Sequence, residues 1–139
     1  MGISGAYSMS KFAVEAMTDA LDDELAPQGV RVSVIEPGTY RSNISKNAQA
    51  RGQGADGLDP SKEGDPDEVA KVVEHALGDA HPKRRYMPVP DPKQAQWAIS
   101  AAFARLVQLN EGQPYQYDRA TLIRMLDAAL AHKPVPSPF

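Results

Sequence analysis

The strongest constraint on the fold is one short segment, residues 30–35. Apolar, mostly β-branched side chains stand at both alternating positions of this segment, and only Arg31 and Ser33 interrupt them. Strands buried on both faces show this two-sided apolarity, which is typical of parallel sheets. The turn residues 36–38 follow directly. We therefore predict a buried parallel strand over residues 30–35 that ends in a turn.

Helical periodicity elsewhere predicts four helices, over residues 11–27, 66–78, 91–110 and 118–131. Their apolar residues are expected to form buried stripes. In chain order these are Val14, Met17, Leu21 and Leu25; Val69, Val72, Val73, Ala76 and Leu77; Trp97, Phe103, Leu106 and Leu109; and Leu122, Ile123, Leu126 and Leu130. A second, shorter strand is expected over residues 85–89, where Pro88 and Pro90 favour an edge or a strand end.

A helix between two strands predicts a right-handed βαβ unit, so the two strands should run parallel. A two-stranded parallel sheet is marginal by itself, and it leaves residues 30–35 with an unpaired apolar edge. The order of elements therefore predicts an α/β chain that forms the back half of a larger sheet. The segment 45–66 is expected to be a long mobile loop, with a helical turn inside it as the alternative. The tail 132–139 is rich in proline.

Composition excludes several classes of function. With 15 Lys and Arg against 18 Asp and Glu, the net charge of −3 offers no general attraction to nucleic acid or to an anionic membrane. No apolar run approaches the ~20 residues that span a bilayer, and the start of the chain has no continuous apolar segment typical of a secretory signal. The sequence has no cysteine, which excludes disulfides and thiolate chemistry. We expect a cytoplasmic chain without nucleic-acid or membrane partners.

The remaining charged groups have modest interpretations. His75, His81 and His132 are scattered without a carboxylate at metal-ligand spacing, so no metal site is expected. The acidic run 22–24 is expected to be the solvated face of a helix. The basic run 83–85 is expected to be a solvated turn, since it is shorter than the usual nucleic-acid patch.

The chemistry is expected at Tyr7 and Lys11, which stand four residues apart at the start of the first helix. This spacing puts both side chains on one face, one turn apart. A free phenol is a poor acid or base at neutral pH. A neighbouring ammonium group and the positive end of a helix both favour the phenolate form, so such a phenol can exchange a proton with a substrate oxygen.

The surroundings of this pair sharpen the interpretation. Residues 5–13, Gly-Ala-Tyr-Ser-Met-Ser-Lys-Phe-Ala, resemble the active-site segment of the short-chain dehydrogenase/reductase family, written Tyr-x-x-Ser-Lys. A helix, a Gly-Val-Arg-Val entry into a strand, and Pro37-Gly38 follow in register. Ser42 stands where the family pattern Pro-Gly-x-x-x-Thr has its threonine, which keeps the hydroxyl group.

The resemblance implies an NAD- or NADP-dependent oxidoreductase that transfers a hydride between nicotinamide and a carbonyl or alcohol substrate. Tyr7 would be the general acid/base, and Lys11 would favour the phenolate and bind the nicotinamide ribose. The implied nicotinamide pocket contains Pro37, Gly38 and Thr39, with Ser42 directed to the carboxamide or diphosphate. The resemblance further implies a Rossmann-like fold, a substrate lid at 45–66 and a possible homo-oligomer.

The resemblance covers the C-terminal part of the family's domain, as a partial domain over residues 1–131. The family's glycine-rich nucleotide loop and its catalytic serine, about a dozen positions before the tyrosine, belong before Met1. Ser4 stands too close to Tyr7 to be that serine. We expect a chain that lacks the N-terminal nucleotide-binding half and is inactive alone. The alternative is a non-catalytic homologue that acts as an interaction or dimerisation module through its strand at 30–35.

Overall fold

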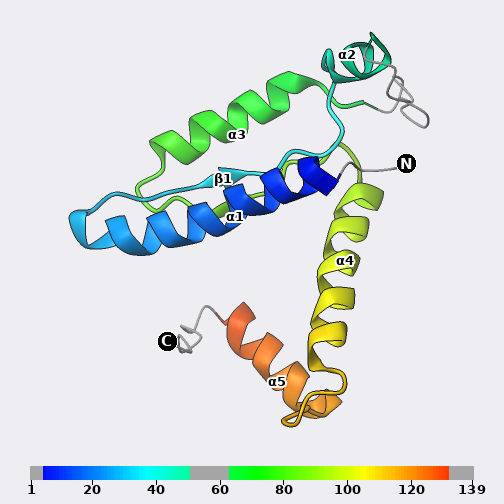
Figure 1. Ribbon diagram of the computed structural model, residues 1–139. Coiled ribbons are helices and arrows are strands. Elements are labelled where there is room, and N and C mark those ends of the chain that lie inside the picture. Colours follow the sequence, from blue (N-terminus) through cyan, green and yellow to red (C-terminus); the bar gives the residue numbers. More distant parts are fainter. Residues whose placement is uncertain (1–4, 51–62, 132–139) are drawn as a thin grey trace. The chain divides into compact units, whose positions relative to one another are not determined.

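The computed structural model describes residues 5–50 and 63–131. The elements follow the order α1 (Gly5–Leu25), a 3-10 turn (Ala26–Gln28), β1 (Val34–Ile35), α2 (Ile44–Ala50), α3 (Pro66–Gly78), β2 (Arg85–Tyr86), α4 (Pro92–Asn110) and α5 (Arg119–Leu130) (Figure 1). The chain forms two compact units, Met1–Gln96 and Trp97–Phe139, and α4 begins in the first and continues into the second. Residues 51–62 of the expected lid and the expected tail 132–139 lie outside the described residues.

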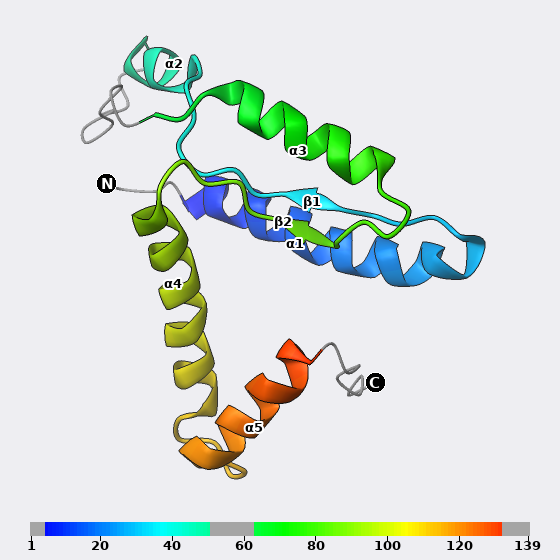
Figure 2. The same ribbon diagram turned by 180° about the vertical axis from the view of Figure 1, so that it is seen from behind.

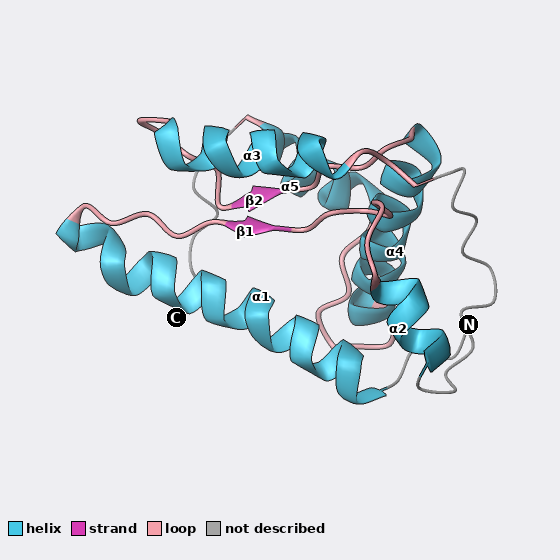
Figure 3. Ribbon diagram, turned by 90° about the horizontal axis from the view of Figure 1, so that it is seen from above, coloured by secondary structure: helices cyan, strands magenta, loops and turns pink. Residues whose placement is uncertain are grey.

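The sheet of the first unit is parallel, as predicted. Val34 pairs with Arg85 and Ile35 pairs with Tyr86, and Figure 2 shows β2 running alongside β1. Seen from above, the strand pair lies between α1 and α3 (Figure 3). The α/β fold class and the strand–helix–strand order are therefore confirmed, in agreement with part of a Rossmann-like sheet.

Both strands are shorter than predicted. Before β1, the Val32 N–H donates to the Asp22 carboxylate of α1 at 3.0 Å. This backbone group therefore bonds to a helix side chain and not to a neighbouring strand. Beyond β2, Pro88 has no N–H, but its carbonyl still accepts from the Gly38 N–H at 2.8 Å. An isolated hydrogen bond thus still joins the two segments after the regular strands end.

Helix ends follow the local chemistry of the sequence. Helix α1 ends where Pro27 and a left-handed Gly29, with φ 76°, close the chain into a turn, as predicted. Its start at Gly5 lies before the periodic pattern at 11–27, and it places Tyr7 and Lys11 in its first two turns, as expected for a pair at the start of this helix. Asp65 caps α3 by accepting from the Asp67 N–H at 3.2 Å. No helix in the described parts of the chain is long and apolar enough to cross a membrane.

The prediction for the buried face of α1 was wrong. The expected stripe is largely open to solvent, with Val14 42% and Met17 55% exposed, while Asp22 from the expected wet face is 1% exposed. Asp22 is buried because two arginines from neighbouring segments bind its carboxylate. Asp22 Oδ1 accepts from Arg31 Nε at 3.0 Å, and Asp22 Oδ2 accepts from Arg84 Nε at 2.8 Å.

The basic run 83–85 is correspondingly not a solvated turn. Arg84 also reaches Asp23 at 2.6 Å, and Arg85 forms a two-pronged pair with Asp19 at 2.8 and 2.9 Å. These ion pairs attach the acidic face of α1 to the β2 end of the sheet. Paired, hydrogen-bonded charges can be buried where single charges cannot.

The apolar stripes of the second unit are also more exposed than predicted. Trp97 is 72% exposed, and the other predicted stripe residues for which an exposed fraction is given lie between 38% and 71%: Phe103, Leu106, Leu109, Ile123, Leu126 and Leu130. The described part of this unit contains only α5 and most of α4. Two helices cannot cover each other's apolar stripes completely, because each stripe is wider than one helix–helix contact.

Candidate active site

The first half of the candidate site is the Tyr7–Lys11 pair on the first turns of α1. Lys11 Nζ lies 5.4 Å from the centre of the Tyr7 ring, which is a cation–π contact. Tyr7 is 51% exposed, so its phenol is accessible to a small molecule. The Ser10 hydroxyl donates to the Tyr7 carbonyl at 2.7 Å and ties down the same turn. The structure thus brings these two side chains together.

The second half is the turn Pro37–Thr39, which leaves β1 at its carboxyl end. In open α/β sheets, ligands bind at the carboxyl ends of the strands. Figures 1 and 3 show the start of α1 and the segment after β1 at the same end of the first unit. No hydrogen bond among residues 5–50 and 63–131 joins the Tyr7–Lys11 pair to this turn.

The turn is held by a residue that sequence analysis did not identify, Gln94 on the first turn of α4. The Thr39 N–H donates to Gln94 Oε1 at 2.7 Å. A Cβ atom on Gly38 would lie only 2.5 Å from the same oxygen and 3.1 Å from Val89, so a side chain at this position would displace the Gln94 amide from the turn. A sequence signal did exist, because Asp91-Pro92-x-Gln94 fits the start of a capped helix.

Ser42 and residues 39–41 connect the turn to the 45–66 segment, for which the resemblance implies a substrate lid. The Ser42 hydroxyl accepts from the Ile44 N–H at 3.3 Å, at the start of α2. The chain then returns at Gly64, whose N–H donates to the Thr39 carbonyl at 3.0 Å. Ser42 therefore supports the beginning of the 45–66 segment, where helix α2 provides helical structure inside the expected loop.

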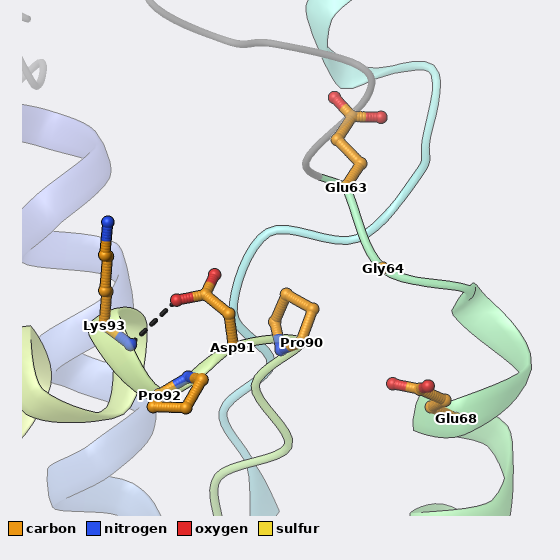
Figure 4. Close-up of a pocket in the computed structure, with 7 residues that line it drawn as sticks. All are labelled: Glu63, Gly64, Glu68, Pro90, Asp91, Pro92 and Lys93. Atoms are coloured by element: carbon orange, nitrogen blue, oxygen red, sulfur yellow. Dashed lines mark hydrogen bonds between the residues drawn. The ribbon is translucent and has the colours of Figure 1, made fainter.

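An open pocket borders the turn. Its volume is about 510 Å³, and it is lined by Glu63, Gly64, Glu68, Pro90, Asp91, Pro92 and Lys93 (Figure 4). Pro90 belongs both to this pocket and to the wall against Gly38, where its Cδ would lie 3.2 Å from an added Cβ. The volume falls within the usual range of ~300–1,000 Å³ for small-molecule sites.

One carboxyl group just before the turn has an unusual environment. Burial raises the pKa of Glu36, the neighbouring Glu15 carboxylate raises it further, and Arg85 opposes both. Arg85 Nε lies 3.6 Å from Glu36 Oε1 and 3.1 Å from Glu15 Oε2, so one guanidinium serves both carboxylates. The sequence pattern places Glu36 in a turn and does not indicate this pairing.

The charges of the site do not form a metal centre. Within residues 5–50 and 63–131, no group of three or more His, Asp or Glu side chains is placed to hold a metal ion. His75 packs its ring edge against Tyr86 at 6.0 Å and pairs with Asp79 at 3.4 Å. His132 lies outside the described residues.

Comparison with known proteins identifies the relatives of this site. The family model described as short chain dehydrogenase matches residues 2–53, which include both halves of the candidate site. The chain is 37% identical over 86 residues to the uncharacterized oxidoreductase YbbO of Escherichia coli, covering 59% of this chain and 32% of that protein. No solved structure matches significantly.

Two further relatives are similar to this chain. It is 33% identical over 136 residues to retinol dehydrogenase 5 of Mus musculus, covering 74% of this chain and 41% of that enzyme. It is 41% identical over 76 residues to protein FixR of Bradyrhizobium diazoefficiens, covering 54% of this chain and 27% of that protein. The chain thus spans well under half the length of these curated relatives, and by its family match and its relatives it belongs to the short-chain dehydrogenase/reductase family.

Proposed function

We propose that this chain supplies the acid/base and nicotinamide-side residues of an NAD- or NADP-dependent oxidoreductase that acts on a carbonyl or alcohol substrate. One observation carries the proposal: the half-exposed Tyr7 phenol with the Lys11 ammonium group 5.4 Å from its ring, on the first turns of α1. The oxidoreductase and dehydrogenase names of two relatives support the same reaction class.

The residues of the turn fit a nicotinamide. The backbone at Gly38 packs closely against Gln94, Val89 and Pro90, which fixes its position beside the pocket. Both backbone groups of Thr39 are occupied, by Gln94 and by Gly64, and no described residue hydrogen-bonds to its hydroxyl group. That hydroxyl group is therefore available for the carboxamide of a nicotinamide. The adjoining pocket offers room for a small substrate.

In this proposal the chain's own residues handle the proton. A nicotinamide cofactor held by these residues would supply the hydride chemistry. Tyr7 donates its phenolic proton to the substrate oxygen during reduction and takes it back during oxidation. Lys11, whose ammonium group lies 5.4 Å from the centre of the Tyr7 ring, donates to the ribose hydroxyls beside the phenol.

The direct test uses nicotinamide mononucleotide and the 139-residue chain in a two-dimensional amide NMR titration. We expect weak, saturable shifts at the amides of residues 5–11 and at Gly38 and Thr39. Lys11→Met is expected to weaken this binding strongly, since it removes the ribose donor. Lys71→Met, at an exposed lysine of α3, is the matched control and should bind as the wild type does. Shifts confined to other regions would contradict the proposal.

We further propose that the chain by itself binds the complete dinucleotides only weakly and does not turn over substrate. The turn and the Tyr7–Lys11 pair provide contacts to the nicotinamide end, whereas the family's glycine-rich nucleotide loop belongs on an earlier strand. Calorimetry with NADH or NADPH should therefore show no tight binding. Micromolar affinity for either dinucleotide would contradict this expectation.

The second candidate function is an interaction module. It is favoured by the outer edge of β1, since β2 pairs with only one side of this strand among the described residues. Such a module would show concentration-dependent association in analytical ultracentrifugation and no amide shifts with nicotinamide mononucleotide. The same titration therefore separates the two functions.

A further inference from the structure

We infer that Gln94 is a positioning residue of the candidate active site: its side-chain amide fixes the Gly38–Thr39 turn against the start of α4. This inference rests on the proposed function, because it assigns a role to the turn that would line the nicotinamide. Gln94 lies 55 residues after Thr39 in the chain. It lies outside residues 2–53, the part that matches the family model.

The clamp begins with the cap of α4. Asp91 Oδ1 accepts from the Lys93 N–H at 2.8 Å and from the Gln94 N–H at 3.1 Å, which places Asp91 as the N-cap with Pro92 at the first helical position. Figure 4 shows the Asp91–Lys93 bond. In a capping box, the third helical residue reaches back to the N-cap backbone. Here the side chain of that residue, Gln94, bonds to the Asp91 side chain and to the Thr39 N–H, and not to the N-cap backbone.

The bonds of Gln94 use both ends of its amide. Its Nε2 group donates to Asp91 Oδ2 at 2.8 Å, and its Oε1 atom accepts from the Thr39 N–H at 2.7 Å. The first bond fixes which end of the amide faces the turn, so the oxygen meets the N–H. The Gln94 amide is also the main reason why the pKa of Asp91 is lowered. Only a side chain with one donor and one acceptor at this length satisfies both partners.

The clamp controls the geometry of the turn where the sheet no longer does. The last bond between the strand segments is from the Gly38 N–H to the Pro88 carbonyl, at 2.8 Å. The next residue, Thr39, receives Gln94 in place of a strand partner. Without Gln94, the Thr39 N–H would lose its partner among the described residues, and only the bond from the Gly64 N–H to the Thr39 carbonyl would still hold the Thr39 backbone.

The test compares Gln94→Met, which keeps the length but makes no such bonds, with Gln96→Met at an exposed glutamine of the same helix. We expect Gln94→Met to weaken nicotinamide mononucleotide binding roughly tenfold, as expected for one lost hydrogen bond to a positioning group. The Thr39 amide should exchange its hydrogen faster, while the amides of Val34 and Glu36 keep their protection. Gln96→Met should change neither measurement.

A second variant keeps the inference testable if Gln94→Met loses its fold. Gln94→Glu places a carboxylate beside that of Asp91, with Glu63, Glu68 and Lys93 as the other charged groups lining the adjacent pocket. At about pH 8 the two carboxylates repel each other, so binding should be weak. Toward about pH 5 the new carboxyl group begins to take up a proton and again offers one donor and one acceptor. Nicotinamide affinity should then recover relative to the wild type at the same pH.

Each outcome is decisive. Wild-type affinity in Gln94→Met together with fast exchange at Thr39 would overturn the positioning role, and unchanged exchange at Thr39 would overturn the clamp itself. An affinity of Gln94→Glu that does not rise with acidification would also count against the clamp. Absence of nicotinamide binding in the wild-type chain would instead contradict the proposed function, and the positioning role with it.

Discussion

Tyr7→Phe is expected to abolish turnover almost completely in an oxidoreductase that joins residues 1–131 to a nucleotide-binding half. The substitution removes one oxygen atom and leaves the ring beneath Lys11, which lies 5.4 Å from its centre. General acid–base groups typically contribute about 10²–10⁴-fold to the rate, so a loss of that order in kcat is expected. Steady-state kinetics with a carbonyl substrate and either reduced cofactor measures it.

Cofactor affinity should separate this effect from a loss of structure. Because the phenyl ring still packs against the Lys11 side chain, the dissociation constant for the cofactor should change little in Tyr7→Phe. Tyr115→Phe is the matched control, at a tyrosine of the second unit that is 81% exposed, and it should retain full activity. Retained turnover in Tyr7→Phe would remove Tyr7 from the mechanism.

Asp22→Ala is expected to be the most destabilising single substitution among the charged residues of the first unit. Asp22 is 1% exposed and accepts hydrogen bonds from Arg31, Arg84 and the Val32 N–H. Removing one partner of a buried pair commonly costs about 3–5 kcal/mol. Because the side chains of Arg31 and Arg84 are 48% and 35% exposed and can regain water, we expect a loss of about 2–3 kcal/mol in the free energy of unfolding.

Urea unfolding followed by circular dichroism measures this loss. Asp23→Ala is the matched control, since Asp23 is 72% exposed and, in the described part of the chain, forms an ion pair with Arg84 alone. Its effect should stay below about 1 kcal/mol, as for an exposed ion pair. Equal effects of the two substitutions would show that burial of Asp22 does not contribute to stability.

Acid should act through the same carboxylate. Hydrogen bonds from Arg31, then from the Val32 N–H, hold the pKa of Asp22 far below its usual value. A carboxyl group with a depressed pKa in the folded state stabilises the fold above its unfolded pKa, and this contribution is lost as the pH falls toward the folded value. The stability difference between wild type and Asp22→Ala should therefore be constant from about pH 5 upward and shrink below about pH 4.

The sequence alone determined what depends on neighbours along the chain. The Tyr7–Lys11 spacing predicts a shared helix face, and the structure places Lys11 over the Tyr7 ring. Pro27 and Gly29 predict the end of α1, where they lie. The helix between two strands predicts parallel pairing, and β1 and β2 pair in parallel. Periodicity, capping residues and turn residues act within a few positions, so a sequence shows them directly.

Only the tertiary structure decided which side chains meet across the fold. Asp22 is buried because arginines 9 and 62 positions away in the chain both bind its carboxylate. A prediction from helical periodicity places every carboxylate on the solvated face, so it could not indicate this burial. Gln94 met Thr39 because α4 begins beside the end of β1, at a separation of 55 residues. The free energy of such a contact depends on all the groups that surround it in the folded protein. Those groups come from distant parts of the chain, so the neighbouring residues in the sequence do not reveal them.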